Sequence, residues 1–265
     1  MPRSVTVTYR VLSTPAETAR AAAQLFLDAA VKSAAARGIA RIAISGGTTP
    51  KSMFALLADP AGPFLKQVPW DKIELYWVDE RCVPPDNAES NYRMTREALL
   101  SKVPLPAERV HRMEGELAPE VAAARYESII RNSFKLEGAE TPTFDLVLLG
   151  MGDDGHTASL FPHTEALNEM SHIVVPNHVP QKDTWRITLT WPVINQGREV
   201  AFLIEGGGKA QVLHDVFLGP YQPETYPSQI IRPASGRLTL LLDAAAASKL
   251  PAPAESDSSG TLELR

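Results

Sequence analysis

The sequence predicts an α/β fold of three layers, in which a mostly parallel, Rossmann-like sheet carries helices on both faces. The first observation is that short, nearly continuous apolar runs, such as FDLVLL (144–149) and VAFLI (200–204), alternate with helical segments. Such runs are typical of parallel strands buried on both faces. The second is that polar, glycine-rich loops follow several of these runs. Because ligands bind at the carboxyl ends of the strands in such sheets, a site is expected in these loops.

The first elements of the chain carry the clearest local signals. The segment VTVTYRVL (5–12) alternates as a strand does. A helix is expected from Pro15 to Gly38, because Thr14 can cap it, Glu17 completes a capping box and glycine is a good C-terminal stop. The further strands are expected at 39–45, 72–80, 144–150, 172–177, 185–191, 200–205 and 237–243, and the further helices at 51–59, 91–102, 119–134 and about 209–218.

Length and composition limit the number of domains and the classes of binding partner. A chain of 265 residues that is 44% hydrophobic can bury one large core, and we expect a single α/β catalytic domain over residues 1–250. The tail 251–265 is rich in Pro, Ala and Ser and is expected to be flexible. The net charge of −5 argues against a nucleic-acid partner, and no run is apolar enough for a membrane. One cysteine, Cys82, excludes an internal disulfide and suits a cytoplasmic protein.

The stretch SGGTTPKS (45–52) has the features of an anion cradle. Gly46 and Gly47 allow a tight turn after a strand, Thr48 and Thr49 supply hydroxyl groups, and a new helix presents unpaired N–H groups. Phosphate is the anion that suits such a turn best. The alternative is a plain strand-to-helix turn with a threonine cap.

The stretch VDERCVPPDNAESNY (78–92) places Asp79, Glu80 and Arg81 where an apolar strand ends. Charged side chains at that point are expected to line a pocket. Arg81 can bind a phosphate, polarise a carbonyl group, or simply pair with a neighbouring carboxylate. Cys82 is a poor candidate for a nucleophile, because no histidine base is adjacent to it.

The stretch GMGDDGH (150–156) has the glycine spacing of a dinucleotide-binding turn. Two aspartates would repel a pyrophosphate there, and the next strand ends in Asn177 rather than in an acidic residue. A metal site is disfavoured because one histidine and two aspartates within five residues is not a usual ligand spacing. We therefore expect His156 to exchange protons and Asp154 to orient it, although a purely structural histidine stays open.

Two further positively charged residues are candidates for the same ligand site. EGGGKA (205–210) lacks the spacing of a phosphate-binding P-loop, but it brings Lys209 to the end of a strand. Arg186, in TWRITLTW, can add another positive charge. Either residue can instead be an ordinary surface charge.

Together these loops resemble the 6-phosphogluconolactonase family, which is related to the glucosamine-6-phosphate deaminases. The resemblance covers residues 40 to 210 and rests on the three motifs just described, on RITLTWPVIN and on GGGKA. The deaminases carry Asp-Glu-Tyr where this chain has Asp79-Glu80-Arg81, and Asn-Glu-Pro where it has Leu160-Phe161-Pro162. Both departures follow the lactonase pattern.

The resemblance implies hydrolysis of 6-phosphoglucono-δ-lactone to 6-phosphogluconate, the second step of the oxidative pentose phosphate pathway. It implies that His156 is the general base, that Asp154 orients it or holds sugar hydroxyls, and that Arg81 assists as a cation. No metal or organic cofactor is expected, because a lactone is already an activated ester. The other residues expected to bind the substrate and its phosphate are Gly46, Gly47, Thr48, Thr49, Asp79, Lys209 and Arg186.

Two other functions stay open at this point. One is an amino-sugar-phosphate deaminase or isomerase. The other is a non-catalytic sugar-phosphate sensor, which usually needs an attached DNA-reading domain, and the first 40 residues contain no basic helix-turn-helix. In each case the expected partner is a small phosphorylated sugar, and the expected state is a monomer or a weak dimer.

Overall fold

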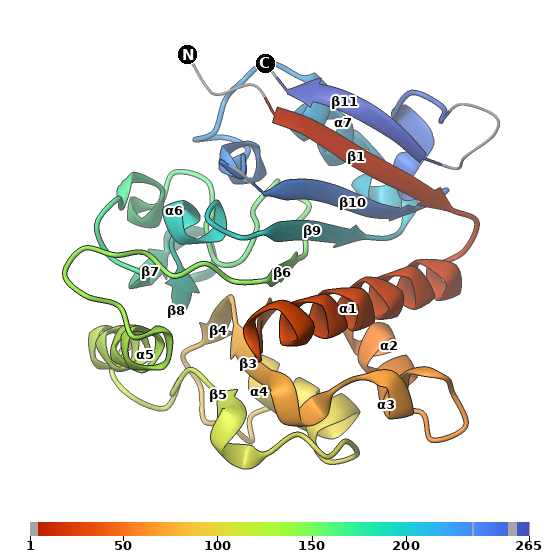
Figure 1. Cartoon of the computed structure of the whole chain (residues 1–265). Helices are drawn as coiled ribbons and strands as arrows, with labels where there is room; N and C mark the ends of the chain where they lie inside the picture. The colour runs from red at the N-terminus through yellow and green to blue at the C-terminus, as the bar shows by residue number, and fades with distance from the viewer. Residues whose placement is uncertain (1–4, 235, 254–258, 265) are drawn as a thin grey trace.

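The computed structural model describes residues 5–234, 236–253 and 259–264, which form two sheets and their covering helices (Figure 1). Within these residues the main sheet has eight strands in the order β11-β1-β10-β9-β6-β2-β3-β5, parallel except for the pair β1 and β11. The smaller sheet has three antiparallel strands in the order β4-β8-β7 in the same described part.

The bounds of these elements locate the loops of interest. The main sheet consists of β1 (Val5–Leu12), β2 (Ala40–Ile44), β3 (Ile73–Trp77), β5 (Val110–His111), β6 (Leu146–Leu149), β9 (Glu199–Ile204), β10 (Arg237–Asp243) and β11 (Ser259–Leu264). The smaller sheet consists of β4 (Asp79–Arg81), β7 (Val174–Val179) and β8 (Thr184–Leu189). The α-helices are α1 (Pro15–Arg37), α2 (Thr48–Leu57), α3 (Phe64–Gln67), α4 (Asn91–Thr95), α5 (Pro119–Phe134), α6 (Trp191–Ile194) and α7 (Ala210–Leu218).

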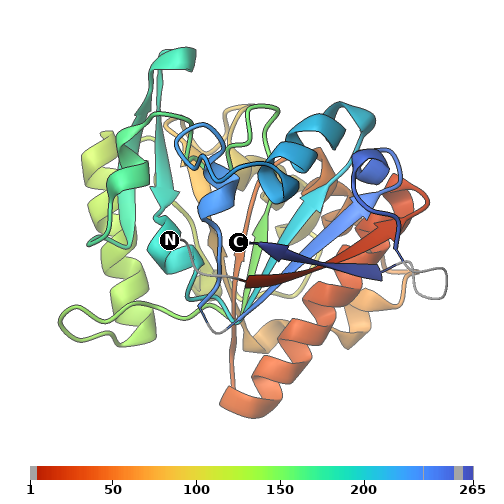
Figure 2. The same ribbon diagram turned by 90° about the horizontal axis from the view of Figure 1, so that it is seen from above.

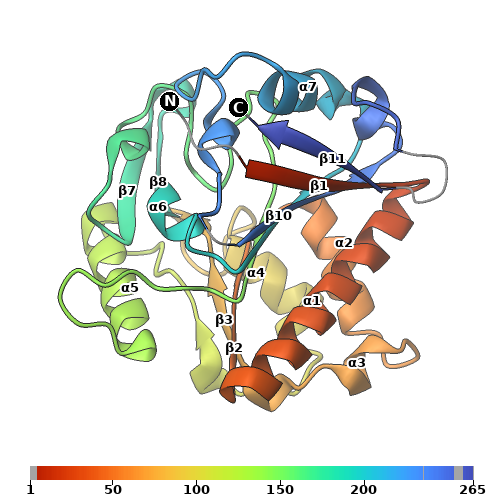
Figure 3. The same cartoon turned by 45° about the horizontal axis from the view of Figure 1, so that its top comes forward.

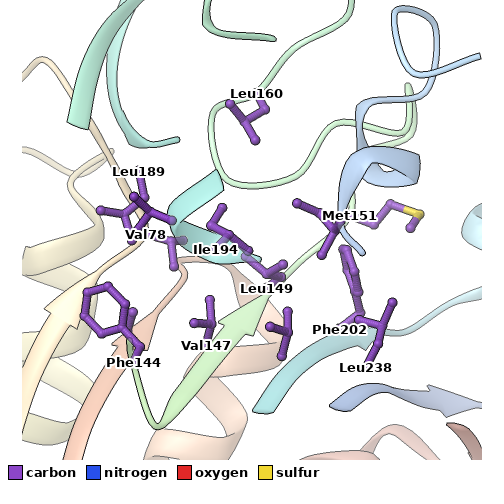
Figure 4. Packing of buried hydrophobic residues seen from close by; sticks show 14 of the residues in the cluster. Val78, Phe144, Val147, Leu149, Met151, Leu160, Leu189, Ile194, Phe202 and Leu238 are labelled. Atoms are coloured by element: carbon purple, nitrogen blue, oxygen red, sulfur yellow. The ribbon is translucent and has the colours of Figure 1, made fainter. Parts of the chain in front are cut away.

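Alternate side chains of the central strand β6 enter different cores. Leu146 and Leu148 pack with residues of α1 and α2, whereas Val147 and Leu149 pack with residues of α5 and α7. All four side chains are fully buried. Figure 1 shows α1 to α3 on one side of the sheet, and Figure 4 shows part of the core on the other side. The predicted α/β fold with a mostly parallel sheet between helices is confirmed.

The local signals of α1 also appear in the structure. Thr14 Oγ1 accepts a hydrogen bond from the Glu17 amide at 3.2 Å, and Gly38 ends the helix with a φ of 77°. The Glu17 carboxylate bonds back to the amide of Ser13 at 2.9 Å, one residue before the capping threonine.

The segment expected as one strand at 72–80 is instead divided between the two sheets. Val78 donates its N–H to Ile44 of β2 at 2.9 Å, and its carbonyl accepts the N–H of Leu189 of β8 at 2.8 Å. The chain therefore leaves the main sheet at Val78, and Asp79–Arg81 pairs with β8 as β4. The strands β7 and β8 form an antiparallel hairpin, because only a short turn, Pro180–Lys182 and Asp183, joins them.

The tail differs from the expectation of a flexible segment. Residues Ser259–Leu264 form β11, which pairs antiparallel with β1 at the edge of the main sheet (Figures 2 and 3). Leu262 and Leu264 are buried in the core, so apolar burial holds this strand in place. The prediction used the composition of the tail and overlooked that Leu262 and Leu264 are two residues apart, as in a strand with one buried face. Residues 254–258 and 265 of the tail lie outside the described residues.

The helix expected at 91–102 is interrupted. Ser90 caps α4, since its Oγ accepts a hydrogen bond from the Arg93 amide at 3.1 Å. After Thr95 the backbone widens into a π-helical turn at Arg96–Leu100. Its closing bond joins Ser101 N–H to the carbonyl of Arg96 at 3.0 Å.

Candidate active site

The separate loops singled out in the sequence meet in one pocket of about 320 Å³. It lies beyond the carboxyl ends of β2, β6 and β9, next to β4 and β8 of the smaller sheet. The expected residues that line it are Gly46, Gly47, Thr48, Thr49, Asp79, Arg81, His156, Arg186 and Lys209. Asp154 does not line the pocket but contacts it through His156.

The loop that carries His156 is fixed at both ends by apolar side chains. Met151 and Leu160 are buried in the core that Figure 4 shows. Between them the loop turns back on itself, because the Gly152 amide donates to the carbonyl of His156 at 2.9 Å. Gly155 has a φ of 75°, a backbone conformation that favours glycine. The glycines of GMGDDGH thus allow this tight turn. In the part of the chain that the structure describes, no helix begins at Gly155, as a dinucleotide-binding turn would require.

Asp154 holds the imidazole of His156 in a defined orientation. Its Oδ1 lies 2.5 Å from His156 Nδ1 and also accepts the His156 amide at 3.1 Å. Partial burial of the carboxyl group opposes its ionisation, but the hydrogen bonds and charge of His156 outweigh this and lower the pKa of Asp154 to about 2. The ring of Phe161 stacks on the imidazole with centroids 4.0 Å apart. The remaining ring nitrogen, Nε2, has no hydrogen bond within the described residues and is available to a ligand.

The loop before α2 forms an open cradle. Gly47, with a φ of 117°, precedes the helix, and no side chain caps the first turn of α2. Gly46 packs so closely on Asn91 that an added Cβ would lie 1.8 Å from Asn91 Oδ1. Ser45 Oγ lines the same pocket and is buried without a hydrogen-bond partner in the part of the chain described. Unpaired amides at a helix N-terminus and a buried, unpaired hydroxyl group suit an anionic ligand.

Two arginines of the smaller sheet line the same pocket as this cradle. Arg81 and Arg186 are paired across β4 and β8, and both line the pocket. Burial, and then the charge of Arg81, lower the pKa of Arg186. Two positive charges on the wall of one pocket attract an anionic ligand such as a phosphate.

Lys209 lies at another edge of the pocket. Its Nζ is paired with Asp153, an exposed neighbour of Asp154 in the histidine loop. Lys182, on the turn between β7 and β8, also lines the pocket, and its Nζ lies 5.6 Å from the centre of the Phe161 ring. The positive charges that line the pocket therefore come from the strands β4 and β8, from the turn between β7 and β8, and from the segment after β9.

The charged residues after Val78 have different roles. Asp79 is buried, lines the pocket and accepts a hydrogen bond from Ser159 Oγ at 2.7 Å, which ties β4 to the histidine loop. Glu80 points the other way, since side chains alternate along a strand. Its carboxylate accepts the amides of Arg81, Asn91 and Tyr92 at 2.8 Å each and the hydroxyl of Ser90 at 3.0 Å. Glu80 therefore holds the start of α4.

Replacing Glu80 with alanine is expected to lower the free energy of unfolding by about 2–4 kcal/mol, because buried amide groups lose their acceptor. Denaturant unfolding measures the change. The exposed Glu108 offers the control, as Glu108→Ala should leave unfolding almost unaltered. Equal stability of the Glu80 variant and the wild type would contradict this structural role.

Several pocket residues were not foreseen from the sequence. They are Ser45, Asn91, Ser159, Lys182 and Glu205. Glu205 follows β9 as Asp79 follows Val78, so the same argument about charges at strand ends could have found it. Asn91 and Ser159 lie in helical and loop segments, where the sequence carries no comparable signal.

The structure also bears on three features that the sequence disfavoured: a cysteine nucleophile, a metal site and a membrane-spanning helix. Burial raises the pKa of the half-buried Cys82 thiol to about 11, so little thiolate forms near neutral pH. Among the residues described, no group of three or more His, Cys, Asp and Glu side chains could hold a metal ion. In the same residues, no helix has the length and apolar character needed to cross a bilayer.

Comparison with known proteins identifies the family to which the chain belongs. The model of the family described as glucosamine-6-phosphate isomerases/6-phosphogluconolactonase matches residues 13–240. The 6-phosphogluconolactonase of a Nostoc species is 43% identical over 84% of this chain and 89% of its own length. That of a Synechocystis species is 43% identical over 83% of this chain and 88% of its own length.

Solved structures give the same result. The 6-phosphogluconolactonase from Trypanosoma cruzi superposes with a TM-score of 0.79 at 32% identity, over 91% of this chain and 96% of that one. A monomeric glucosamine-6-phosphate deaminase has a TM-score of 0.75 at 20% identity, over 91% of this chain and 99% of that one, which shows a shared fold only. The chain therefore belongs to the glucosamine-6-phosphate isomerase/6-phosphogluconolactonase family, and within it to the 6-phosphogluconolactonases.

Proposed function

We propose that this protein hydrolyses 6-phosphoglucono-δ-lactone to 6-phosphogluconate, with His156 as the general base. The observation that carries the proposal is the Asp154–His156 pair, whose free Nε2 belongs to the same pocket as the open cradle and the two arginines. The names of the relatives support the substrate, and the residue roles rest on the geometry.

The proposed reaction has two proton transfers. Asp154 keeps the proton of the imidazole on Nδ1, so that Nε2 can accept a proton from a water molecule. The water oxygen bonds to the lactone carbonyl carbon and an oxyanion forms. When the bond between this carbon and the ring oxygen breaks, His156 returns the proton to the ring oxygen. The product is the open-chain acid, and the reaction requires no metal or organic cofactor.

The two ends of the substrate are assigned by position in the pocket. The phosphate would lie on the amides of Gly47, Thr48 and Thr49 and on the hydroxyl of Thr48, with Arg81 and Arg186 opposite. The oxyanion would lie near Lys209, because this lysine contacts the histidine loop through Asp153. Arg81 thus acts on the phosphate in this proposal, rather than on the reacting carbonyl.

Replacing Arg81 with alanine is expected to raise KM by roughly 10- to 100-fold with a smaller change in kcat, because a charge-assisted contact to phosphate is lost. Hydrolysis of non-phosphorylated gluconolactone should be unaffected by the same change. Steady-state kinetics on the two lactones measures both effects, and the exposed Arg20 provides the control variant Arg20→Ala. An equal loss on both lactones would place Arg81 at the reacting carbonyl instead.

One assay tests the proposed function as a whole. Lactone loss is followed above its spontaneous hydrolysis, together with ammonia release from glucosamine 6-phosphate. Rapid lactone loss without ammonia is expected. Ammonia release would favour the deaminase alternative, and binding of 6-phosphogluconate without turnover would favour a sensor. A monomer or weak dimer in the cytoplasm stays a prediction, since a relative from rice is chloroplastic.

A further inference from the structure

Glu205 is a carboxylate in a pocket that is otherwise suited to anions. It follows β9, lines the pocket and is half-buried. Its Oε2 accepts a hydrogen bond from Thr49 Oγ1 at 2.9 Å, whereas its Oε1 is buried without a hydrogen-bond partner among the described residues. A buried polar atom with no partner in a functional pocket needs an explanation.

No positive charge in the described part of the chain is paired with Glu205. The nearest basic group in the sequence, Lys209, is paired with Asp153 instead. The neighbouring carboxylate is Asp243 of β10, which accepts the amides of Gly206 at 3.0 Å and Ala246 at 2.8 Å. Burial raises the pKa of Glu205, the hydrogen bond from Thr49 opposes this shift, and the charge of Asp243 adds to it. When it is ionised, its negative charge acts directly on any anion in the pocket.

The hydrogen bond to Thr49 gives Glu205 a second effect. A threonine in the first turn of a helix can turn its hydroxyl to a nearby backbone group. Here Glu205 holds the hydroxyl, and no side chain caps the first turn of α2. The amides of that turn therefore stay open to a ligand.

We propose that Glu205 sets how tightly the pocket holds phosphorylated ligands: it positions Thr49 in the cradle, and its charge favours release of the product. This inference rests on the proposed function. Hydrolysis of a lactone creates a new carboxylate, so the product carries one more negative charge than the substrate. The charge of Glu205 therefore acts more strongly against 6-phosphogluconate than against the lactone, and it lowers inhibition by the product.

Two variants separate the two effects. Glu205→Gln keeps the side-chain size and an acceptor for Thr49 but removes the charge, and it is expected to lower the inhibition constant of 6-phosphogluconate by about 3- to 10-fold at pH 8. Its effect on KM for the lactone should be smaller. Glu205→Ala also removes the acceptor, so it is expected to raise KM. Glu108→Gln removes an exposed carboxylate elsewhere and should leave both constants unaltered.

The dependence on pH provides an independent readout. As the pH falls and Glu205 takes up a proton, the wild type should approach Glu205→Gln in its affinity for the product. Asp243, Lys209, His156, Asp79, Arg81, Lys182 and Arg186, together with the phosphate itself, are the same in both proteins, so the ratio of the two constants isolates Glu205. Thermal melting confirms that each variant is folded.

The outcomes can be told apart from a failure of the proposed function. If the wild type turns over the lactone but Glu205→Gln binds the product no more tightly than the wild type, this inference alone is overturned. A ratio that does not change with pH would overturn it as well. If the wild type neither hydrolyses the lactone nor binds 6-phosphogluconate, the proposed function fails, and this inference fails with it.

Discussion

Replacing His156 with alanine is expected to lower kcat by about 10²- to 10⁴-fold, the usual contribution of a general base. The fold should persist, because the imidazole is bonded to Asp154 and stacked on Phe161 at the pocket wall and is not part of the core. KM should change little, since the phosphate is bound elsewhere in the pocket. Lactone loss above spontaneous hydrolysis measures the effect.

The control for this variant is another histidine outside the pocket. His172 is exposed and paired with Glu169, and it does not line the pocket. His172→Ala should therefore retain the kcat of the wild type. Near-wild-type turnover of the His156 variant would exclude this residue as the base and leave the reaction without its proposed proton acceptor.

Replacing Gly152 with alanine is expected to lower kcat by about 10²-fold or more, because a small displacement of a catalytic group has effects of this size. An added Cβ would lie 2.0 Å from His156 Nδ1 and 2.6 Å from Asp154 Oδ1. Both side chains would have to move, and their hydrogen bond would be lost. Since neither is in the core, stability should change much less than activity.

Gly208 is the matched control for this substitution. A Cβ at Gly208 would meet no atom within 4 Å, and its backbone conformation is not restricted to glycine. Gly208→Ala should therefore keep most of the activity. Kinetics and thermal melting of the two variants decide the question. Full activity of Gly152→Ala would mean that the contact between Asp154 and His156 does not matter for the reaction.

The fold was largely predictable because its signals are local. Apolar runs, capping residues and glycine stops determine α1, β6 and β9 within a few residues of the chain. The division at Val78 was not predictable in this way, because it depends on hydrogen bonds to Ile44 and Leu189, which are distant in sequence. A continuous apolar pattern does not tell on which sheet each end of a strand will pair.

The sequence predicted most of the selected residues that line the candidate site, but it predicted fewer of the contacts between them. Strand ends and glycine loops brought Arg81, His156 and Lys209 to attention, and the pocket contains all three. The pairing of Arg81 with Arg186 depends on the smaller sheet, which the sequence did not indicate. The alternation along β4 could have separated Asp79 from Glu80 beforehand, since adjacent side chains of a strand face opposite ways.

The position of Val78 between the two sheets has a consequence for substrate choice. The guanidinium groups come from the smaller sheet, while the histidine loop follows β6 of the main sheet. In the proposed mechanism, the spacing between the arginines that hold the phosphate and the histidine base therefore depends on the joint between the two sheets, at the fully buried Val78. Substitutions that repack the side chains around Val78 are therefore expected to change the length of ligand that fits, while the proposed proton-transfer groups stay the same.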